Sequence, residues 1–261
     1  MRSVRRLVLC LAVLCLSGCS PAEPPAPEET RPSGAVPWGY GGDAGPAAWG
    51  RLSVDYDACA SGTHQSPIDL TGGRARSQSA PMVDYGASGI ELMNTGQTIE
   101  MRFDAGSWLG LEGGRYALEQ LHFHVPSEHQ VEGQSFPMEL HLMHRASSDA
   151  RAIVGVLVEV GARNAALAAI LDNLPDGTEL PRQVLDARVT AADLIPRATA
   201  WYRYDGSLTE PPCSEGVRWL VAAEPLQVDE AQLEQMKAVV RDNHRPIQPA
   251  NGRPVFIDAS S

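Results

Sequence analysis

Residues 116–124 read YALEQLHFH, and residues 138–144 read MELHLMH. Short runs of this kind, apolar or alternating apolar and polar, predict two β-strands. Successive side chains of a strand point to opposite faces, so His122 and His124 lie on one face. A neighbouring antiparallel strand would bring His141 to the same place. The two stretches therefore predict a sheet that gathers three histidines.

Three histidines arranged in this way are the ligand set of a catalytic zinc. Neutral imidazoles bind Zn²⁺ through a ring nitrogen, and three of them leave the fourth tetrahedral position open. A ligand histidine usually donates its other N–H to an oxygen. Gln120 and Glu139 each lie two residues before a candidate ligand on the same strand face, where such an acceptor is useful. The alternative for both is a polar residue on a half-buried strand.

The pair His122 and His124 also has two other interpretations. Two histidines on one strand face can be packed, hydrogen-bonded core residues. Together with Glu128 the pair also resembles the first metal motif of the cupins, which are small β-barrels, but Gly114 and Gly133 do not fall where that motif has glycines. The remaining histidines lack this spacing and are expected to be surface or hydrogen-bonded residues: His64, His129, His144 and His244.

Short apolar or alternating runs dominate the chain after about residue 38, separated by clusters of Gly, Pro, Asn and Asp. One run, 152–160, is almost continuously apolar, as expected of a strand buried on both faces. Asn164 can cap a helix over 165–173, and Asp229 can cap a helix to about 242 with Gln232 as its capping-box partner. We expect one β-rich α+β domain, residues 38–258, with a large, mostly antiparallel central sheet and short peripheral helices. The expected strands are 90–93, 98–103, 116–124, 138–144, 152–160 and 217–223.

The first residues have the pattern of an export signal. Three arginines precede the apolar run Leu7–Leu16, which is too short for a stable membrane anchor. Leu16-Ser17-Gly18-Cys19 resembles a lipobox, which predicts a signal peptide over 1–18 and lipidation of Cys19; the alternative is ordinary secretory cleavage near Gly18. Residues 19–37 are rich in proline and glutamate and are predicted to be an extended tether. We expect export to the periplasmic or cell-surface side and lipid anchoring to a membrane.

The net charge bears on nucleic-acid binding, and the cysteine content bears on disulfide formation. Loss of the three signal arginines lowers the formal charge from −11 to −14, which gives no electrostatic basis for nucleic-acid binding. Once the signal cysteines and Cys19 are set aside, Cys59 and Cys213 remain. Two cysteines in an exported domain indicate one disulfide, and the alternative is two free buried thiols.

Further motifs match one family in order and spacing. The chain resembles an alpha-class carbonic anhydrase of the bacterial exported type over nearly all of residues 38–257. This resemblance implies about ten strands and a zinc enzyme that converts CO₂ and water to bicarbonate and a proton. The matching segments are Trp38-Gly39-Tyr40-Gly41, Gln65-Ser66-Pro67-Ile68, Gln120-Leu121-His122-Phe123-His124, Ser127-Glu128-His129, Glu139-Leu140-His141, Gly206-Ser207-Leu208-Thr209-Glu210-Pro211-Pro212-Cys213 and Asn243-His244-Arg245-Pro246.

The resemblance also implies roles for single residues. His122, His124 and His141 match the zinc ligands. Thr209 matches the threonine that accepts a hydrogen bond from zinc-bound hydroxide, and Glu128 matches the glutamate that accepts the threonine's proton. The other implied positions are hydrogen-bond partners of the ligands at Gln120, Glu139 and Asn243, an apolar CO₂ wall at Met143, Ile153, Leu208 and Trp219, and a disulfide between Cys59 and Cys213.

Two positions depart from the family pattern. The usual proton-shuttle histidine is replaced by Gln97, which cannot titrate, so proton transfer would depend on water, buffer or another group. Glu210 follows Thr209 in the substrate pocket, where the family often has threonine or another small or neutral residue. A carboxylate there can oppose deprotonation at the zinc, take over proton transfer, or point to solvent without effect.

The competing functions are a catalytically weak or silent binding protein of the same fold and a different zinc hydrolase. Silent relatives typically lose a zinc histidine, whereas this chain keeps all three together with Thr209 and Glu128. The sequence therefore favours an active enzyme whose partners are a small-molecule substrate, CO₂ or bicarbonate, and a membrane reached only through Cys19. It leaves open whether the protein is a monomer or a dimer.

Overall fold

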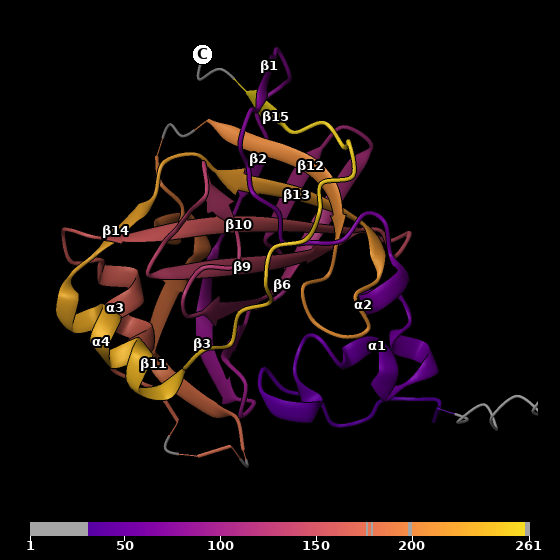
Figure 1. Ribbon diagram of the computed structural model, residues 1–261. Helices are drawn as coiled ribbons and strands as arrows, with labels where there is room; N and C mark the ends of the chain where they lie inside the picture. The colour runs from indigo at the N-terminus through magenta and orange to yellow at the C-terminus, as the bar shows by residue number, and fades with distance from the viewer. Residues whose placement is uncertain (1–30, 176, 179, 198–199, 259–261) are drawn as a thin grey trace, which may run out of the picture. The chain divides into compact units, whose positions relative to one another are not determined.

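A large mixed sheet forms the centre of the molecule (Figure 1). The computed structural model describes residues 31–258 apart from 176, 179, 198 and 199. In this part of the chain thirteen strands join in one sheet, and β7–β8 form a separate pair. The strands are β1 (Arg74–Arg76), β2 (Met82–Asp84), β3 (Ala87–Asn94), β4 (Ile99–Arg102), β5 (Trp108–Leu111), β6 (Gly114–His124), β7 (Gln130–Val131), β8 (Gln134–Ser135), β9 (Met138–Arg145), β10 (Arg151–Val160), β11 (Arg182–Thr190), β12 (Trp201–Ser207), β13 (Glu215–Ala222), β14 (Leu226–Val228) and β15 (Phe256–Asp258).

The strand order confirms the predicted fold class and adds a parallel component. The main path of the sheet runs β1-β15-β12-β13-β10-β9-β6-β4-β3-β11, with β14 paired to β10, and β2 and β5 joined through β6. Three pairings are parallel, namely β1 with β15 and β10 with both β13 and β14. The other pairings of the sheet are antiparallel, including β6 with β9 and β9 with β10. Each of the six predicted strands overlaps an observed one.

The helices are short and lie at the periphery (Figure 1). The α-helices are α1 (Trp49–Leu52), α2 (Ala58–Ser61), α3 (Ala165–Leu171) and α4 (Glu230–Val239). Asn164 caps α3 as predicted, and Asp229 with Gln232 forms the predicted capping box of α4. The second helix ends three residues earlier than expected, because Val240 has extended backbone angles.

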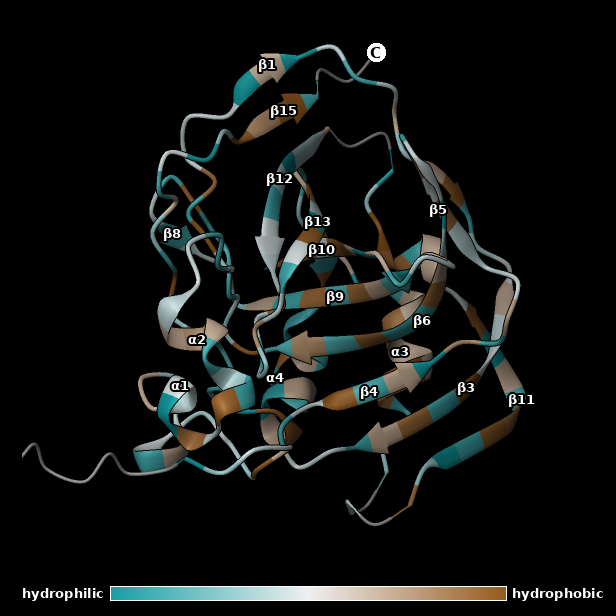
Figure 2. Ribbon diagram, turned by 90° about the vertical axis from the view of Figure 1, so that its right-hand side faces the viewer, coloured by the Kyte–Doolittle hydropathy of each residue, from teal (hydrophilic) through white to brown (hydrophobic). Residues whose placement is uncertain are grey.

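Strand β10 explains why the core has two parts. Ala152, Val154, Val156 and Val158 face the larger apolar cluster, which also contains side chains of α3 and α4. Ile153 and Leu157 face a second cluster built around Trp219. The strand is therefore buried on both faces, as its continuous apolar run predicts. Brown and teal residues alternate along β9 and β3 in Figure 2, as expected of strands with faces of different polarity.

Part of the predicted tether is attached to the folded domain. The carbonyl of Pro32 accepts hydrogen bonds from the backbone N–H of Val54 (2.9 Å) and from Ser53 Oγ (3.1 Å). Val36 N–H donates to the hydroxyl of Tyr56 at 3.1 Å. The ordered domain thus includes residues before 38, whereas the predicted signal peptide, Cys19 and residues 20–30 lie outside the described residues. None of the helices in the described part of the chain is long and apolar enough to cross a membrane.

Candidate active site

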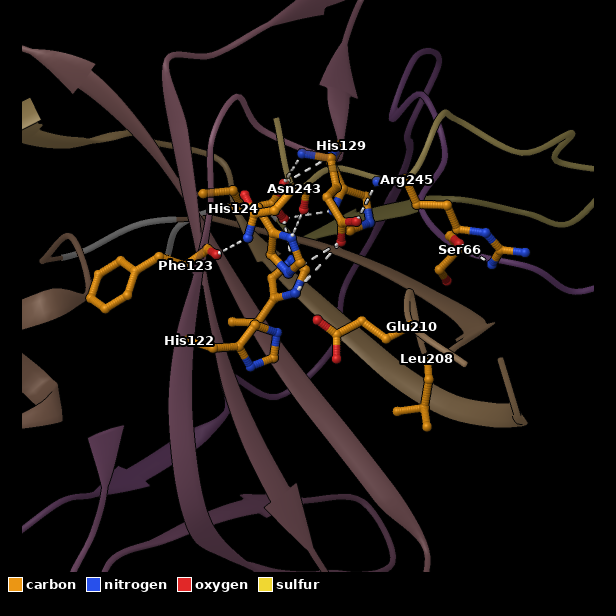
Figure 3. Close-up of polar contacts among 12 residues, drawn as sticks. Ser66, His122, Phe123, His124, His129, Leu208, Glu210, Asn243 and Arg245 are labelled. Atoms are coloured by element: carbon orange, nitrogen blue, oxygen red, sulfur yellow. Dashed lines mark hydrogen bonds and ion pairs between the residues drawn. The ribbon is translucent and has the colours of Figure 1, made fainter. Parts of the chain in front are cut away.

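Strands β6 and β9 bring the three predicted histidines together. His122 and His141 are directly opposite each other in the antiparallel ladder, and His124 follows on the same face of β6. Their ring centroids are 4.5–5.2 Å apart. One nitrogen of each ring lies within 4.8 Å of the others, and all three residues are buried. Figure 3 places two of the rings, those of His122 and His124, close together.

Each ring donates its other N–H to an oxygen. His122 Nδ1 donates to Gln120 Oε1 at 3.0 Å, and His141 Nε2 donates to Glu139 Oε1 at 2.9 Å. His124 Nδ1 donates to the backbone carbonyl of Asn243 at 2.7 Å. These are the partners that the strand alternation and the family resemblance predicted.

The opposite nitrogens of the rings converge and are poorly satisfied. His124 Nε2 and His141 Nδ1 are buried and have no hydrogen-bond partner among the described residues. Burial lowers the pKa of all three histidines, to about 3 for His124, and the positive charge that a neighbouring histidine would carry adds to each decrease. The rings are therefore neutral near pH 7 and present free nitrogen lone pairs, which is what a zinc ion binds.

Glu139 connects the histidine site to its surroundings. Its Oε1 also accepts from His129 Nδ1 at 2.7 Å, and its Oε2 accepts from the N–H groups of Glu128 (2.9 Å) and His129 (2.8 Å). Burial favours the protonated acid, but the charge that His129 and His141 would carry, together with the hydrogen bonds from their rings, holds the pKa of Glu139 well below its usual value. His129, Glu139 and His141 also lie within 4.8 Å of one another. Because those atoms already hydrogen bond to each other, we interpret them as a structural network rather than a second metal site.

Thr209 and Glu128 lie next to the histidines and contact each other. The Thr209 hydroxyl hydrogen bonds to the Glu128 carboxylate. Glu128 Oε1 accepts from the backbone N–H of Arg245 at 2.7 Å, and Glu128 Oε2 is 3.5 Å from His124 Nε2. Burial raises the pKa of Glu128 well above its usual value, and the hydrogen bonds from Thr209 and Arg245 oppose that rise.

No role was predicted for Arg245 from the sequence, although it belongs to the segment Asn243-His244-Arg245-Pro246. Its guanidinium is buried and donates to the carbonyls of Ser66 (2.7 Å) and Cys59 (3.0 Å). Cys59 forms a disulfide with Cys213, and Cys213 N–H donates to the carbonyl of Glu210 at 2.8 Å. The predicted disulfide is confirmed, and with Arg245 it holds the loop that carries Thr209.

A cavity of about 280 Å³ opens onto the histidines. Met143, Ile153 and Leu208 form its predicted apolar wall. Trp219 differs from expectation, since it lies behind the histidines in the second core cluster, with its ring 4.9 Å from that of His141. The cavity is lined by Glu119, Gln120, His122, His141, Met143, His144, Arg145, Arg151, Ile153, Leu208, Thr209, Glu210 and Pro211.

Gln97 and Glu210 occupy different positions relative to this cavity. Gln97 Nε2 donates to the carbonyl of Trp38 at 2.6 Å, and the residue does not line the cavity. Glu210 does line it, and its Oε1 accepts a hydrogen bond from the Tyr40 hydroxyl at 3.0 Å. Burial raises the pKa of Glu210 to about 7, with the Tyr40 hydrogen bond opposing and the charge of Glu100 adding to the rise.

The chain is similar to known proteins along most of its length. The model of the eukaryotic-type carbonic anhydrase family matches residues 44–259. A carbonic anhydrase of Nostoc sp. is 36% identical over 254 residues, which cover 95% of this chain and 94% of that protein. A carbonic anhydrase of Neisseria gonorrhoeae is 39% identical over 221 residues, 84% of this chain and 87% of that protein. The structure of the α-carbonic anhydrase of Thermovibrio ammonificans in complex with the inhibitor sulfanilamide matches with a TM-score of 0.83 and 38% identity, over 85% of this chain and 100% of that one.

Proposed function

Since the chain belongs to the eukaryotic-type carbonic anhydrase family, enzymes that interconvert CO₂ and bicarbonate, we propose that it performs this reaction with a zinc ion bound by His122, His124 and His141. The observation that carries the proposal is the hydrogen bonding of the three rings. An oxygen fixes each ring from outside, and the inward-facing nitrogens of His124 and His141 are buried and lack a partner in the part of the chain that the structure describes. Buried polar atoms normally have partners, and a metal ion would satisfy these.

The donor set fits zinc. It consists of three neutral imidazoles with an adjoining cavity, as in catalytic zinc sites with one open position. In carbonic anhydrases, the best-known example of the effect, bound zinc lowers the pKa of water to about 7 and so supplies a nucleophile at neutral pH.

Thr209 and Glu128 would orient the attacking oxygen. A cation held by the histidines favours the ionised form of Glu128, whose Oε2 is 3.5 Å from His124 Nε2. The ionised carboxylate accepts a hydrogen bond from the Thr209 hydroxyl, which leaves the threonine oxygen free to act as an acceptor. That oxygen can receive a hydrogen bond from the nucleophile and fix its free lone pair toward the substrate. This is a positioning effect.

The apolar wall would hold CO₂. Met143, Ile153 and Leu208 offer dispersion contacts without competing hydrogen bonds. The substrate would therefore lie between these side chains and the polar group formed by Thr209 and Glu128.

The test combines metal content with activity. The purified protein is expected to contain stoichiometric zinc, to hydrate CO₂ in a stopped-flow indicator assay and to be inhibited by sulfanilamide. His122→Ala should lose zinc and activity together, whereas His64→Ala, at an exposed position, should retain both. Stoichiometric zinc without CO₂ hydration would identify a silent binding protein. Zinc retention in His122→Ala would contradict the ligand assignment.

We also expect proton transfer to limit turnover, because Gln97 has no titratable group. Its amide is held by the carbonyl of Trp38. Gln97→His should raise turnover at low buffer concentration, and imidazole buffer should raise turnover of the wild type. Gln97→Ala is the matched control, since it frees the position without adding a titratable group. An equal gain from both substitutions would mean that the effect is not a proton shuttle.

Export and lipid anchoring remain part of the proposal on the pattern of residues 1–19. Wild-type protein should label with palmitate and fractionate with membranes, whereas Cys19→Ser should be released or retained with its signal uncleaved. Unlabelled wild-type protein in the soluble fraction would leave ordinary secretory cleavage as the explanation.

A further inference from the structure

Glu210 places a second carboxylate in the active-site cavity, beside the residue that orients the nucleophile. It follows Thr209 in the loop between β12 and β13 and lines the same cavity as His122 and His141. Figure 3 shows its carboxylate directed toward the histidine rings. The cavity next to the proposed metal therefore contains a fixed acidic group.

This side chain is held from two directions. The Glu210 carbonyl accepts from the N–H of Cys213, which is cross-linked to Cys59. The Glu210 carboxylate accepts from the hydroxyl of Tyr40. The Tyr40 ring packs edge-on against Trp38 and Trp49, with centroid distances of 5.6 and 5.7 Å, so its hydroxyl is itself fixed. The carboxylate therefore cannot turn freely to solvent.

Among the residues that the structure describes, positively charged side chains do little to compensate Glu210. Burial raises the pKa of Glu210, and the charge that adds to this rise is that of another acid, Glu100. Arg145 and Arg151 line the same cavity, but they face each other across β9 and β10, four residues beyond His141. Four strand residues span about 13 Å. Arg145 is moreover paired with Glu119 (2.8 Å) and Asp149 (2.7 Å).

We propose that Glu210, fixed by Tyr40, makes this site discriminate against anions. It weakens the binding of small monovalent anions, bicarbonate among them, beside the three histidines, and it leaves the binding of neutral CO₂ unaffected. The inference rests on the proposed function, because such anions would bind next to the cation that the histidines hold. Like charges in a partly buried cavity repel strongly enough to weaken anion binding by about tenfold or more.

The test measures thiocyanate binding to the zinc-loaded protein by calorimetry at pH 8.5, with the KM for CO₂ as the neutral comparison. Glu210→Gln keeps an oxygen that can accept the Tyr40 hydrogen bond and removes only the charge. It should tighten thiocyanate binding about tenfold and lower the KM for bicarbonate, while the KM for CO₂ changes less than about twofold. Glu210→Thr, which is smaller and also neutral, should give the same direction and serves if the glutamine variant does not fold.

Two controls separate the charge of Glu210 from other causes. Glu119→Gln neutralises another carboxylate of the same cavity, one that is already paired with Arg145, and should change thiocyanate binding less than about threefold. Tyr40→Phe removes the hydrogen bond that fixes the carboxylate but keeps its charge, so thiocyanate affinity should lie between those of wild type and Glu210→Gln. Equal thiocyanate affinity in wild type and Glu210→Gln would overturn the inference, as would an equal gain from Glu119→Gln. A wild-type protein that holds no zinc would instead contradict the proposed function.

Discussion

Removal of the Cys59–Cys213 disulfide should cost this domain a large part of its stability. The two cysteines are separated by 154 residues, so the cross-link closes a long loop of the unfolded chain. In the chain-entropy description, a loop of this length corresponds to about 5 kcal/mol of stability. A domain of this kind is stabilised by only about 5–15 kcal/mol in total.

The cross-link also has a local effect. Cys59 lies in α2, within an apolar cluster that contains Trp49 and Tyr56, and Cys213 ends the loop that carries Thr209. Without the bond, this loop is still held by the hydrogen bond from Gln65 Nε2 to the Cys213 carbonyl at 3.0 Å. We therefore expect zinc content to be retained in the folded fraction and kcat to fall.

Guanidinium unfolding of wild type, wild type with reductant, and the double variant Cys59→Ala with Cys213→Ala measures the loss. Both perturbed forms should lose about 5 kcal/mol, or be unfolded before denaturant is added. The two perturbations are independent, because the variant cannot react with reductant at these positions. A loss below about 1 kcal/mol at an unchanged denaturant slope would refute the view that the bond acts by restricting the unfolded chain.

Three further predictions concern the surroundings of the histidines. Glu139→Gln removes the charge that fixes His141 and should weaken zinc affinity about 10- to 100-fold in chelator competition; unchanged affinity would contradict this. Asn243→Ala leaves its backbone carbonyl for His124 but removes side-chain hydrogen bonds to neighbouring backbone groups, so unfolding should show a loss of about 2 kcal/mol. Burial lowers the pKa of His144 in the folded protein to about 4. As pH drops from 7 to 5, His144 is therefore protonated in the unfolded chain before it is protonated in the folded one, and the free energy of unfolding falls. Over that range the wild type should lose about 2 kcal/mol more than His144→Gln in urea unfolding, and equal losses would mean that His144 is not the cause.

The predicted strands share a physical property. Each of the runs 116–124, 138–144 and 152–160 lies near the middle of the sheet. Side chains there are buried, so the apolar residues needed for burial are visible as a pattern in the sequence. Strand β11, by contrast, was missed. Within residues 31–258, as far as the structure describes them, it pairs only with β3 and exposes most of its side chains, so its sequence shows no alternation between core and solvent. The parallel pairings of β10 were not predictable either, because they join strands far apart in the chain.

Within the site, too, some contacts follow from the local sequence and others depend on residues far apart in the chain. Gln120 with His122, and Glu139 with His141, could be paired from the residues alone, since side chains two apart on a strand share a face. The position of Asn243 near His124 came from resemblance to a family, and the disulfide came from the number of cysteines as well as from that resemblance. The contact of Tyr40 with Glu210 and that of Arg245 with Glu128 came only from the structure. These pairs are 170 and 117 residues apart, and no local pattern relates their positions.

The sequence by itself determined that this protein gathers three histidines on a sheet, because strand geometry is local and has a period of two residues. The tertiary structure decided which nitrogens face inward, which side chains line the cavity, and that Glu210 rather than Gln97 lies within it. Those features depend on loops that return to the sheet from distant parts of the chain. Their positions are set by packing, which is complete only once the whole domain has folded, and by the Cys59–Cys213 cross-link.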